Sequence, residues 1–86
     1  MNTKKYANNE DGKREFVDEV IKPMVCNEGH FKDAIYVSND YGEYIMLYRY
    51  GEDTAAYKID ITANSIKATV WDFCKQFLKY LKEELN

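Results

Sequence analysis

The chain has 86 residues, of which 45% are hydrophobic and 31% are charged, and its formal net charge is −3. This length fits one small domain, and the hydrophobic content, which is arranged in regular periods, excludes a disordered chain. No apolar run is long enough to cross a bilayer and no secretory signal pattern is present, so we expect a soluble cytoplasmic protein. From residue 15 onward there are eight basic and thirteen acidic residues. We therefore expect an acidic folded body that repels nucleic acid and attracts basic surfaces.

The first half of the chain begins with a polar stretch, residues 1–12, that has no periodicity and that we expect to be a flexible lead-in to a domain spanning 13–86. Residues 13–25 then predict a helix, because one helical stripe collects Phe16, Val17, Val20, Ile21 and Met24. Asp11 is the predicted N-cap. Pro23 predicts that this helix stops or kinks there, and residues 26–30 are then a loop.

Three segments with strand character follow, at about residues 32–38, 43–50 and 54–62, separated by glycine-containing turns at 39–42 and 51–53. They predict an antiparallel meander. The last segment predicts a helix of about twenty residues that starts after a cap at Thr62, Asn64 or Ser65. Its expected apolar face contains Ile66, Val70, Phe73, Cys74, Phe77, Leu78, Leu81 and Leu85, with Trp71 and Tyr80 at its flanks. The order α-β-β-β-α predicts an α+β fold with both helices packed on one face of a three-stranded sheet.

Alternation of side chains along the strands indicates which sheet face is buried. The third strand points Ala55, Tyr57, Ile59 and Ile61 inward, and the first strand is expected to point Ile35 and Val37 inward and Tyr36 outward. The second strand is ambiguous, since one face offers aliphatic Ile45 and Leu47 and the other offers tyrosines. We favour the aliphatic face as the buried one, although a slip of one residue would reverse this choice.

The tyrosines would then line an open sheet face, which is either a merely solvated surface or a binding surface of large, rigid side chains. Acids at the two hairpins either only solvate the turns or imitate nucleic-acid phosphates for a basic groove on another protein. The residues that we assign to a partner-binding surface are Tyr36, Tyr44, Met46, Tyr48 and Tyr50 on the sheet, with Asp40, Glu43, Glu52 and Asp53 at the hairpins.

Catalytic and metal-binding patterns are weak. Cys26 and Cys74 lie far apart, outside any C-x-x-C pair, and we expect two buried, reduced thiols. His30 is the single histidine and follows a flexible Glu28-Gly29 pair, so we interpret it as a solvated loop residue. We therefore expect no metal, no cofactor and no enzymatic activity.

Two resemblances bear on function. The order α-β-β-β-α resembles the double-stranded-RNA-binding domain, but the lysine cluster of that family is reduced to Lys67 in the stretch 64–69, and its loop histidine is absent from 39–42. The segment Ile35-Tyr-Val-Ser-Asn-Asp-Tyr-Gly-Glu-Tyr-Ile45 resembles the strand-turn-strand part of small acidic prophage anti-CRISPR proteins, which inhibit the type II CRISPR nuclease. Lysines at 75, 79 and 82 interrupt the region where that family has a dense acidic stretch.

The sequence thus favours a small non-enzymatic binding or inhibitor module, encoded by a phage or mobile element, that docks on a basic partner such as a nucleic-acid-binding nuclease or a nucleoprotein complex. The alternative is a nucleic-acid-binding module that resembles the double-stranded-RNA-binding domain. Without a foreign partner, the same face would instead form a symmetric homodimer.

Overall fold

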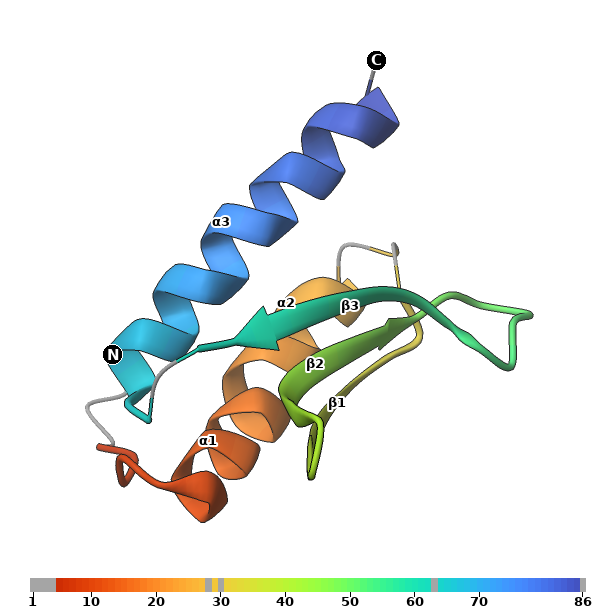
Figure 1. Cartoon of the computed structure of the whole chain (residues 1–86). Helices are drawn as coiled ribbons and strands as arrows, with labels where there is room; N and C mark the ends of the chain where they lie inside the picture. Colours follow the sequence, from red (N-terminus) through yellow and green to blue (C-terminus); the bar gives the residue numbers. More distant parts are fainter. Residues whose placement is uncertain (1–4, 28, 30, 63, 86) are drawn as a thin grey trace.

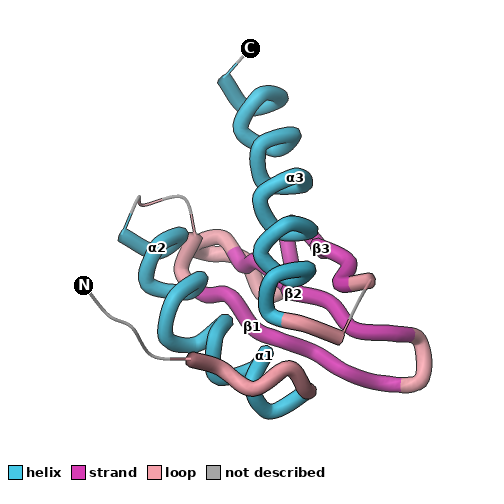
Figure 2. The backbone as a smooth tube through the Cα atoms, turned by 90° about the vertical axis from the view of Figure 1, so that its left-hand side faces the viewer, coloured by secondary structure: helices cyan, strands magenta, loops and turns pink. Residues whose placement is uncertain are grey.

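The structure is a computed structural model that describes residues 5–27, 29, 31–62 and 64–85. Its elements are α1 (Glu10–Phe16), the π-helical turn η1 (Val17–Ile21), α2 (Lys22–Asn27), β1 (Asp33–Asn39), β2 (Gly42–Tyr48), β3 (Ala55–Ile61) and α3 (Ile66–Leu85). The strands form one antiparallel sheet in the order β1-β2-β3, and the helices lie on the same side of it (Figures 1 and 2). The predicted α+β fold, with its order helix, three strands, helix, is confirmed.

The first helix is longer than expected and passes through Pro23. In a regular α-helix, a proline clashes with the carbonyl group four residues before it. The turn η1 replaces that four-residue step by a five-residue one, because the Lys22 amide bonds to the carbonyl of Val17. Pro23 therefore lies in the first turn of α2, where a missing amide hydrogen costs little. The additional residue in the five-residue hydrogen-bonded turn of η1 also rotates the buried side of the helix. Val25 therefore enters the core, while Val20 and Met24, both predicted to be buried, are exposed.

The start of α1 also differs from the prediction. The helix begins at Glu10, because the Asn9 side chain accepts a hydrogen bond of 2.8 Å from the Gly12 amide, and Asp11 belongs to the first turn rather than to the cap. Gly12 is buried beneath the incoming chain, and a Cβ atom there would lie 1.9 Å from the carbonyl oxygen of Ala7. Only glycine permits this close approach.

The segment before α1 also contacts the rest of the domain. The Asn8 side chain accepts a hydrogen bond of 2.8 Å from the Ile66 amide at the start of α3, and the Tyr6 ring lies edge-on to Phe16 at 5.2 Å. The predicted Ser65 cap is present too, since its hydroxyl accepts a hydrogen bond from the Ala68 amide. The cap of α3 thus combines the adjacent Ser65 with Asn8, which is distant in the sequence. Residues 1–4 of the predicted lead-in lie outside the described residues.

The sheet register decides which side chains enter the core. Ile45 lies opposite Ile59 on β3 and opposite Tyr36 on β1, and residues that face each other across antiparallel strands share one side of the sheet. Ile45, Leu47, Ile59 and Ile61 are buried, so the predicted faces of the second strand and of the second half of the third strand are confirmed. The inward placement of Ala55 was wrong, because an irregularity in the pairing opposite Leu47 and Tyr48 sets Ala55 opposite Tyr48 and packs Ala56 against the core instead. The prediction for the first strand was wrong.

On β1 the buried residues are Ala34 and Tyr36, and Ile35 is 41% exposed. A buried tyrosine needs a partner for its hydroxyl. Tyr36 finds that partner in Glu43, so its inward orientation leaves no polar atom unsatisfied.

Helix α3 packs on the sheet through a stripe that is rotated from the predicted one. Thr69, Phe73 and Tyr80 are buried, and the Tyr80 ring lies 4.5 Å from that of Tyr57. Trp71 and Leu78 are 71% and 64% exposed, and Cys74 is also exposed. Val70 is 37% exposed as well. The placement of Val70, Cys74 and Leu78 on the core face was therefore wrong, and so was the burial of the Cys74 thiol.

Candidate functional site

One side of the sheet faces away from the described helices, and we call it the open face. On this face Ile35 of β1 lies opposite Met46 of β2. The neighbouring pair on the same face is Asp33 opposite Tyr48. Ile35 is the most exposed of these apolar residues, and Met46 and Tyr48 are partly exposed. The residues of the open face are Ile35, Val37, Tyr44, Met46, Tyr48, Lys58 and Asp60.

Tyr44 is held in place on the open face by two polar contacts. Its hydroxyl donates a hydrogen bond of 2.9 Å to the side-chain oxygen of Asn39, and the Lys58 ammonium lies 4.2 Å from its ring centroid. Only 9% of the residue is exposed. Tyr44 is therefore a rigid part of the surface and offers little free area, whereas Tyr50, in the β2–β3 connection, is 66% exposed.

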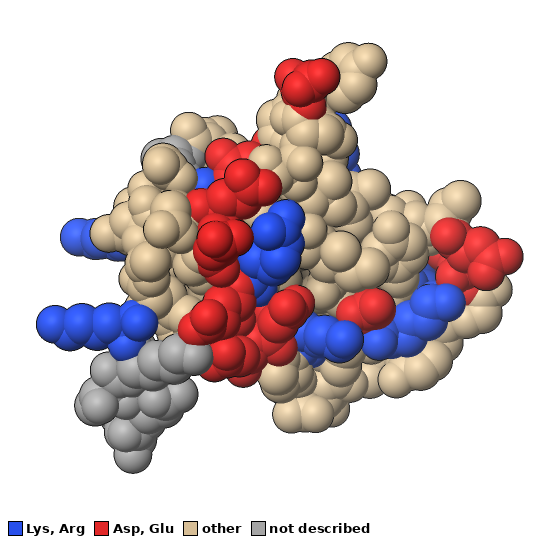
Figure 3. All heavy atoms as spheres, turned by 90° about the horizontal axis from the view of Figure 1, so that it is seen from below, with Lys and Arg blue, Asp and Glu red and all other residues tan. Residues whose placement is uncertain are grey.

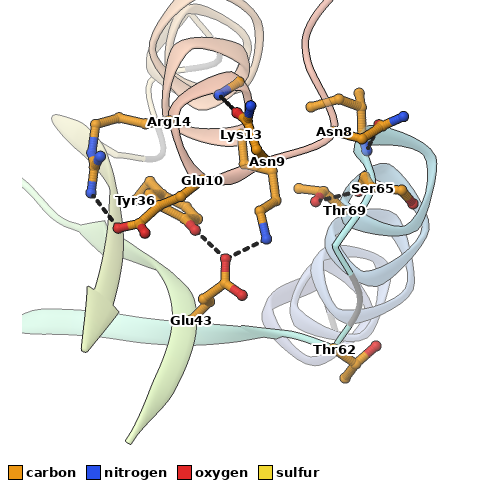
Figure 4. Close-up of polar contacts among 12 residues, drawn as sticks. Asn8, Asn9, Glu10, Lys13, Arg14, Tyr36, Glu43, Thr62, Ser65 and Thr69 are labelled. Atoms are coloured by element: carbon orange, nitrogen blue, oxygen red, sulfur yellow. Dashed lines mark hydrogen bonds and ion pairs between the residues drawn. The ribbon is translucent and has the colours of Figure 1, made fainter. Parts of the chain in front are cut away.

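Two residues that we assigned to the surface belong instead to an internal polar cluster formed by Lys13, Tyr36 and Glu43 (Figure 4). The Glu43 carboxylate pairs with the Lys13 ammonium and accepts a hydrogen bond from the Tyr36 hydroxyl. Lys13 is fully buried, and its ammonium has no other hydrogen-bond partner among the described residues. This cluster joins α1 to the sheet, and it removes Tyr36 and Glu43 from the candidate binding surface.

The charges of this cluster influence one another. Burial alone would raise the pKa of the Glu43 carboxyl, but the Lys13 ammonium and the Tyr36 hydroxyl outweigh burial and lower that pKa below its ordinary value. Burial, followed by the hydrogen bond to the Glu43 carboxylate, raises the pKa of the Tyr36 hydroxyl well above its ordinary value. Glu43 is thus an ionised acceptor and Tyr36 a neutral donor at neutral pH.

The remaining acids of the predicted surface lie in the two hairpin turns and are exposed. Asp40 lies in the β1–β2 turn, and Glu52 and Asp53 lie in the β2–β3 connection. None of these three carboxylates forms an ion pair with another described residue. By contrast, Asp33 pairs with Lys22 at 3.1 Å, and the hydrogen bond and charge of Asp33 raise the pKa of Lys22.

A further group of exposed acids is not among the binding residues predicted from the sequence. Figure 3 shows acidic side chains gathered in a band on the underside of the molecule, where α1 lies at the bottom of Figure 1. The exposed acids of α1 and η1 are Glu10, Asp11, Glu15, Asp18 and Glu19. The sequence places these acids on the polar side of the predicted helix. That they form one band on the surface depends on how α1 lies beside the sheet, which the sequence pattern does not give.

The free edge of β3 is partly closed by α3. The Gln76 side-chain amide bonds to both the amide and the carbonyl group of Asp60, at 3.3 and 3.1 Å, and Asp72 accepts hydrogen bonds from the amide and the hydroxyl of Thr62. A small hollow beside this seam is lined by residues that include Tyr57, Lys79 and Tyr80. These contacts protect an edge strand from pairing with other chains.

Among the described residues, no group of three or more histidine, cysteine or acidic side chains has the geometry to hold a metal ion. Cys26 and Cys74 are free thiols, and Cys26 is partly buried. His30 and Glu28 lie outside the described residues. Among the described helices, none combines the length and the apolar character needed to cross a membrane.

The arrangement therefore presents a partly apolar open face with exposed carboxylates in the turns at both of its ends. Comparison of the chain with models of protein families, with curated proteins and with solved structures found no match.

Proposed function

We propose that this protein is a small non-enzymatic binding module that docks its open face on a basic surface of a partner protein. The observation that carries this proposal is the uncovered apolar centre of the open face, where Ile35 is 41% exposed beside Met46 and Tyr48. Contiguous exposed apolar area often marks an interaction site, and tyrosine and methionine are enriched at interfaces.

The charge at the two ends of the open face supports a basic partner. Antiparallel strands place the β1–β2 turn, with Asp40, at one end and the β2–β3 connection, with Glu52 and Asp53, at the other. Since these exposed carboxylates form no ion pair with another residue that the structure describes, their field extends into solvent and attracts a basic surface. Such charges mainly accelerate the encounter, whereas the apolar centre slows dissociation.

In its more specific form, the proposal is that the partner is a nucleic-acid-binding protein and that the module inhibits it. The support is the resemblance of segment 35–45 to the strand-turn-strand part of phage anti-CRISPR proteins. In this chain that segment contributes Ile35, Val37 and Tyr44 to the open face and Asp40 to its acidic end. Glu43 is excluded from the contact set, because its carboxylate is bonded to Lys13 and Tyr36.

The inhibitor form is tested with a purified type II CRISPR nuclease loaded with guide RNA, by measuring the rate of target-DNA cleavage with and without the protein. We expect slower cleavage with the wild type and with Met24→Asp, and restored cleavage with Ile35→Asp. Met24 is a matched control, because it is an exposed apolar residue on α2, away from the open face. Undiminished cleavage with the wild type would remove the inhibitor form.

The broader proposal is tested by salt-dependent capture of proteins on the immobilised chain. A protein held by the wild type and by Met24→Asp, but lost with Ile35→Asp, identifies the open face as the docking surface. If the two variants hold or lose it equally, the open face is not that surface. Direct binding of RNA or DNA at physiological salt, weakening steeply as salt rises, would favour the nucleic-acid-binding alternative instead.

A further inference from the structure

Helix α3 carries a second apolar stripe on the side that faces away from the sheet. Trp71 and Leu78 are 71% and 64% exposed, Cys74 between them is exposed, and Val70 is 37% exposed. An open, mainly apolar hollow beside Trp71 is lined by Ala68, Val70 and Cys74 as well. Figures 1 and 2 show that the C-terminal turns of α3 extend beyond the sheet, which leaves this side of the helix accessible.

The spacing of this stripe is that of a helix-packing seam. Trp71, Cys74 and Leu78 follow one another at steps of three and four residues, which is the spacing of the core positions of a coiled coil. The apolar face that packs on the sheet is a different stripe, which contains Phe73. Leu81 lies at the margin of that stripe and packs against the core. We call Trp71, Cys74 and Leu78 the outer ridge.

The charges next to the outer ridge are positive. Lys75 directly follows the ridge residue Cys74, and Lys82 lies four residues after Leu78, which places both lysines where coiled coils select their partner by charge. Both lysines are exposed, as is Lys67 one turn before Trp71. No ion pair joins these three lysines to another described residue.

From this pattern we infer that the outer ridge binds an amphipathic helix of a partner protein whose apolar stripe is flanked by acidic residues. The ridge side chains would fill the spaces between the partner's apolar residues, and Lys75 and Lys82 would pair with its carboxylates. This surface is distinct from the open face and prefers the opposite charge in its partner.

The same charges argue against the other occupants. In an antiparallel pair of two α3 helices, Lys75 and Lys82 would face lysines of the second copy, and in a parallel pair they would face Val70 and Phe77 rather than acids. Free phosphate would leave the exposed apolar residues of the ridge uncovered. A leucine-centred ridge also lacks the aromatic series on which bases stack.

The protein contains a single tryptophan, Trp71, so its fluorescence reports directly on the outer ridge. The probe is a synthetic helical peptide of about three heptads, with leucine at the core positions and glutamate at the flanking ones. A second peptide replaces each glutamate by lysine. We expect the acidic peptide to shift Trp71 emission to shorter wavelength in a saturable manner and the basic peptide to leave it unchanged.

Substitutions locate the contact. Leu78→Asp should weaken binding of the acidic peptide by at least about tenfold, whereas Ile35→Asp on the open face should not change it. The double variant Lys75→Glu with Lys82→Glu should reverse the preference and bind the basic peptide. Circular dichroism of each variant verifies that the fold is retained.

Three results would overturn the inference. One is an equal response to the acidic and basic peptides. Another is an emission shift that phosphatidylglycerol vesicles or RNA produce while the acidic peptide does not. The last is an emission shift that follows protein concentration alone, together with a dimer in light scattering, which would assign the outer ridge to a second copy of the chain.

Discussion

The ion pair between Lys13 and Glu43 predicts an unusual asymmetry in stability. The Lys13 side chain is fully buried, while 30% of the Glu43 side chain is exposed. Removing one member of a buried pair is costly because the other charge remains without a partner in a poorly solvated place. That cost should be much larger when the remaining charge is Lys13 than when it is Glu43, which water and the Tyr36 hydroxyl still reach.

We therefore expect Glu43→Gln to lower the free energy of unfolding by about 2 to 3 kcal/mol, somewhat less than the cost of breaking a fully buried pair because the amide oxygen still accepts a hydrogen bond. Lys13→Met, which replaces the charge by an apolar chain of similar length, should cost less than about 1 kcal/mol. Urea denaturation followed by far-ultraviolet circular dichroism measures both values, since the exposed Trp71 is a poor probe of core unfolding.

The pH dependence gives an independent check on the same pair. The pKa of Glu43 is lowered in the folded protein, so its contribution to stability is fully present above the pKa of the unfolded chain and is lost as the pH falls through the folded pKa. Wild-type stability should decline below about pH 4 more steeply than that of Glu43→Gln. The reasoning is refuted if Lys13→Met destabilises the protein as much as Glu43→Gln does. It is also refuted if the stabilities of the wild type and of Glu43→Gln decline in parallel as the pH falls.

Three further predictions address the packing, the caps and the open face. Phe73→Ala should cost about 3 to 5 kcal/mol and Leu78→Ala less than about 1 kcal/mol in urea titrations, and similar losses would mean that α3 packs through a different side. Asn8→Ala should cost about 1 kcal/mol and lower the thermal midpoint, whereas an unchanged midpoint would mean that the cap on α3 does not contribute. Once a partner of the open face is known, Tyr48→Ala should mainly raise the dissociation rate of the complex. Glu52→Lys should mainly slow association and weaken the salt dependence of association. Surface plasmon resonance measures both rates, and the opposite distribution of effects would contradict the proposed roles.

Periodicity predicted the type and order of the elements because these depend on local pattern. Alternation along the third strand placed Ile59 and Ile61 correctly, and the limits of the strands were within two residues of the predicted ones. The face of the first strand could not be predicted in the same way, since Ile35 and Tyr36 both suit a half-buried strand. The choice depends on the hydrogen bond from Tyr36 to Glu43 and on Lys13, whose ammonium reaches Glu43 only after α1 has packed on the sheet.

The helices show the same division between local and long-range information. The position of α3 followed from its periodic pattern. The stripe that packs on the sheet is rotated from the predicted one, because apolar residues occupy two sides of this helix. The π-helical turn before Pro23 and the cap that Asn8 provides for α3 involve geometry that propensity does not encode. Local sequence patterns thus predict the helices and strands, whereas the candidate surfaces depend on which sides of them the packing leaves uncovered.

The uncovered apolar side chains decide how this small domain can be used. The sequence contains more large apolar residues than one sheet face can hold, and the packing buries Tyr36 and Tyr80 while leaving Ile35, Trp71 and Leu78 outside. The exposed residues lie on the two outer sides of a two-layer domain, the open face of the sheet and the outer ridge of α3. Because one side is bounded by exposed acids and the other by exposed lysines, the two sides prefer partners of opposite charge. A two-layer domain of this kind is suited to joining a basic partner to an acidic one. Since Ile35→Asp and Leu78→Asp each change one side only, the two interactions can be removed separately, and a domain that joins two partners should lose the ternary complex with either substitution while keeping one binary complex.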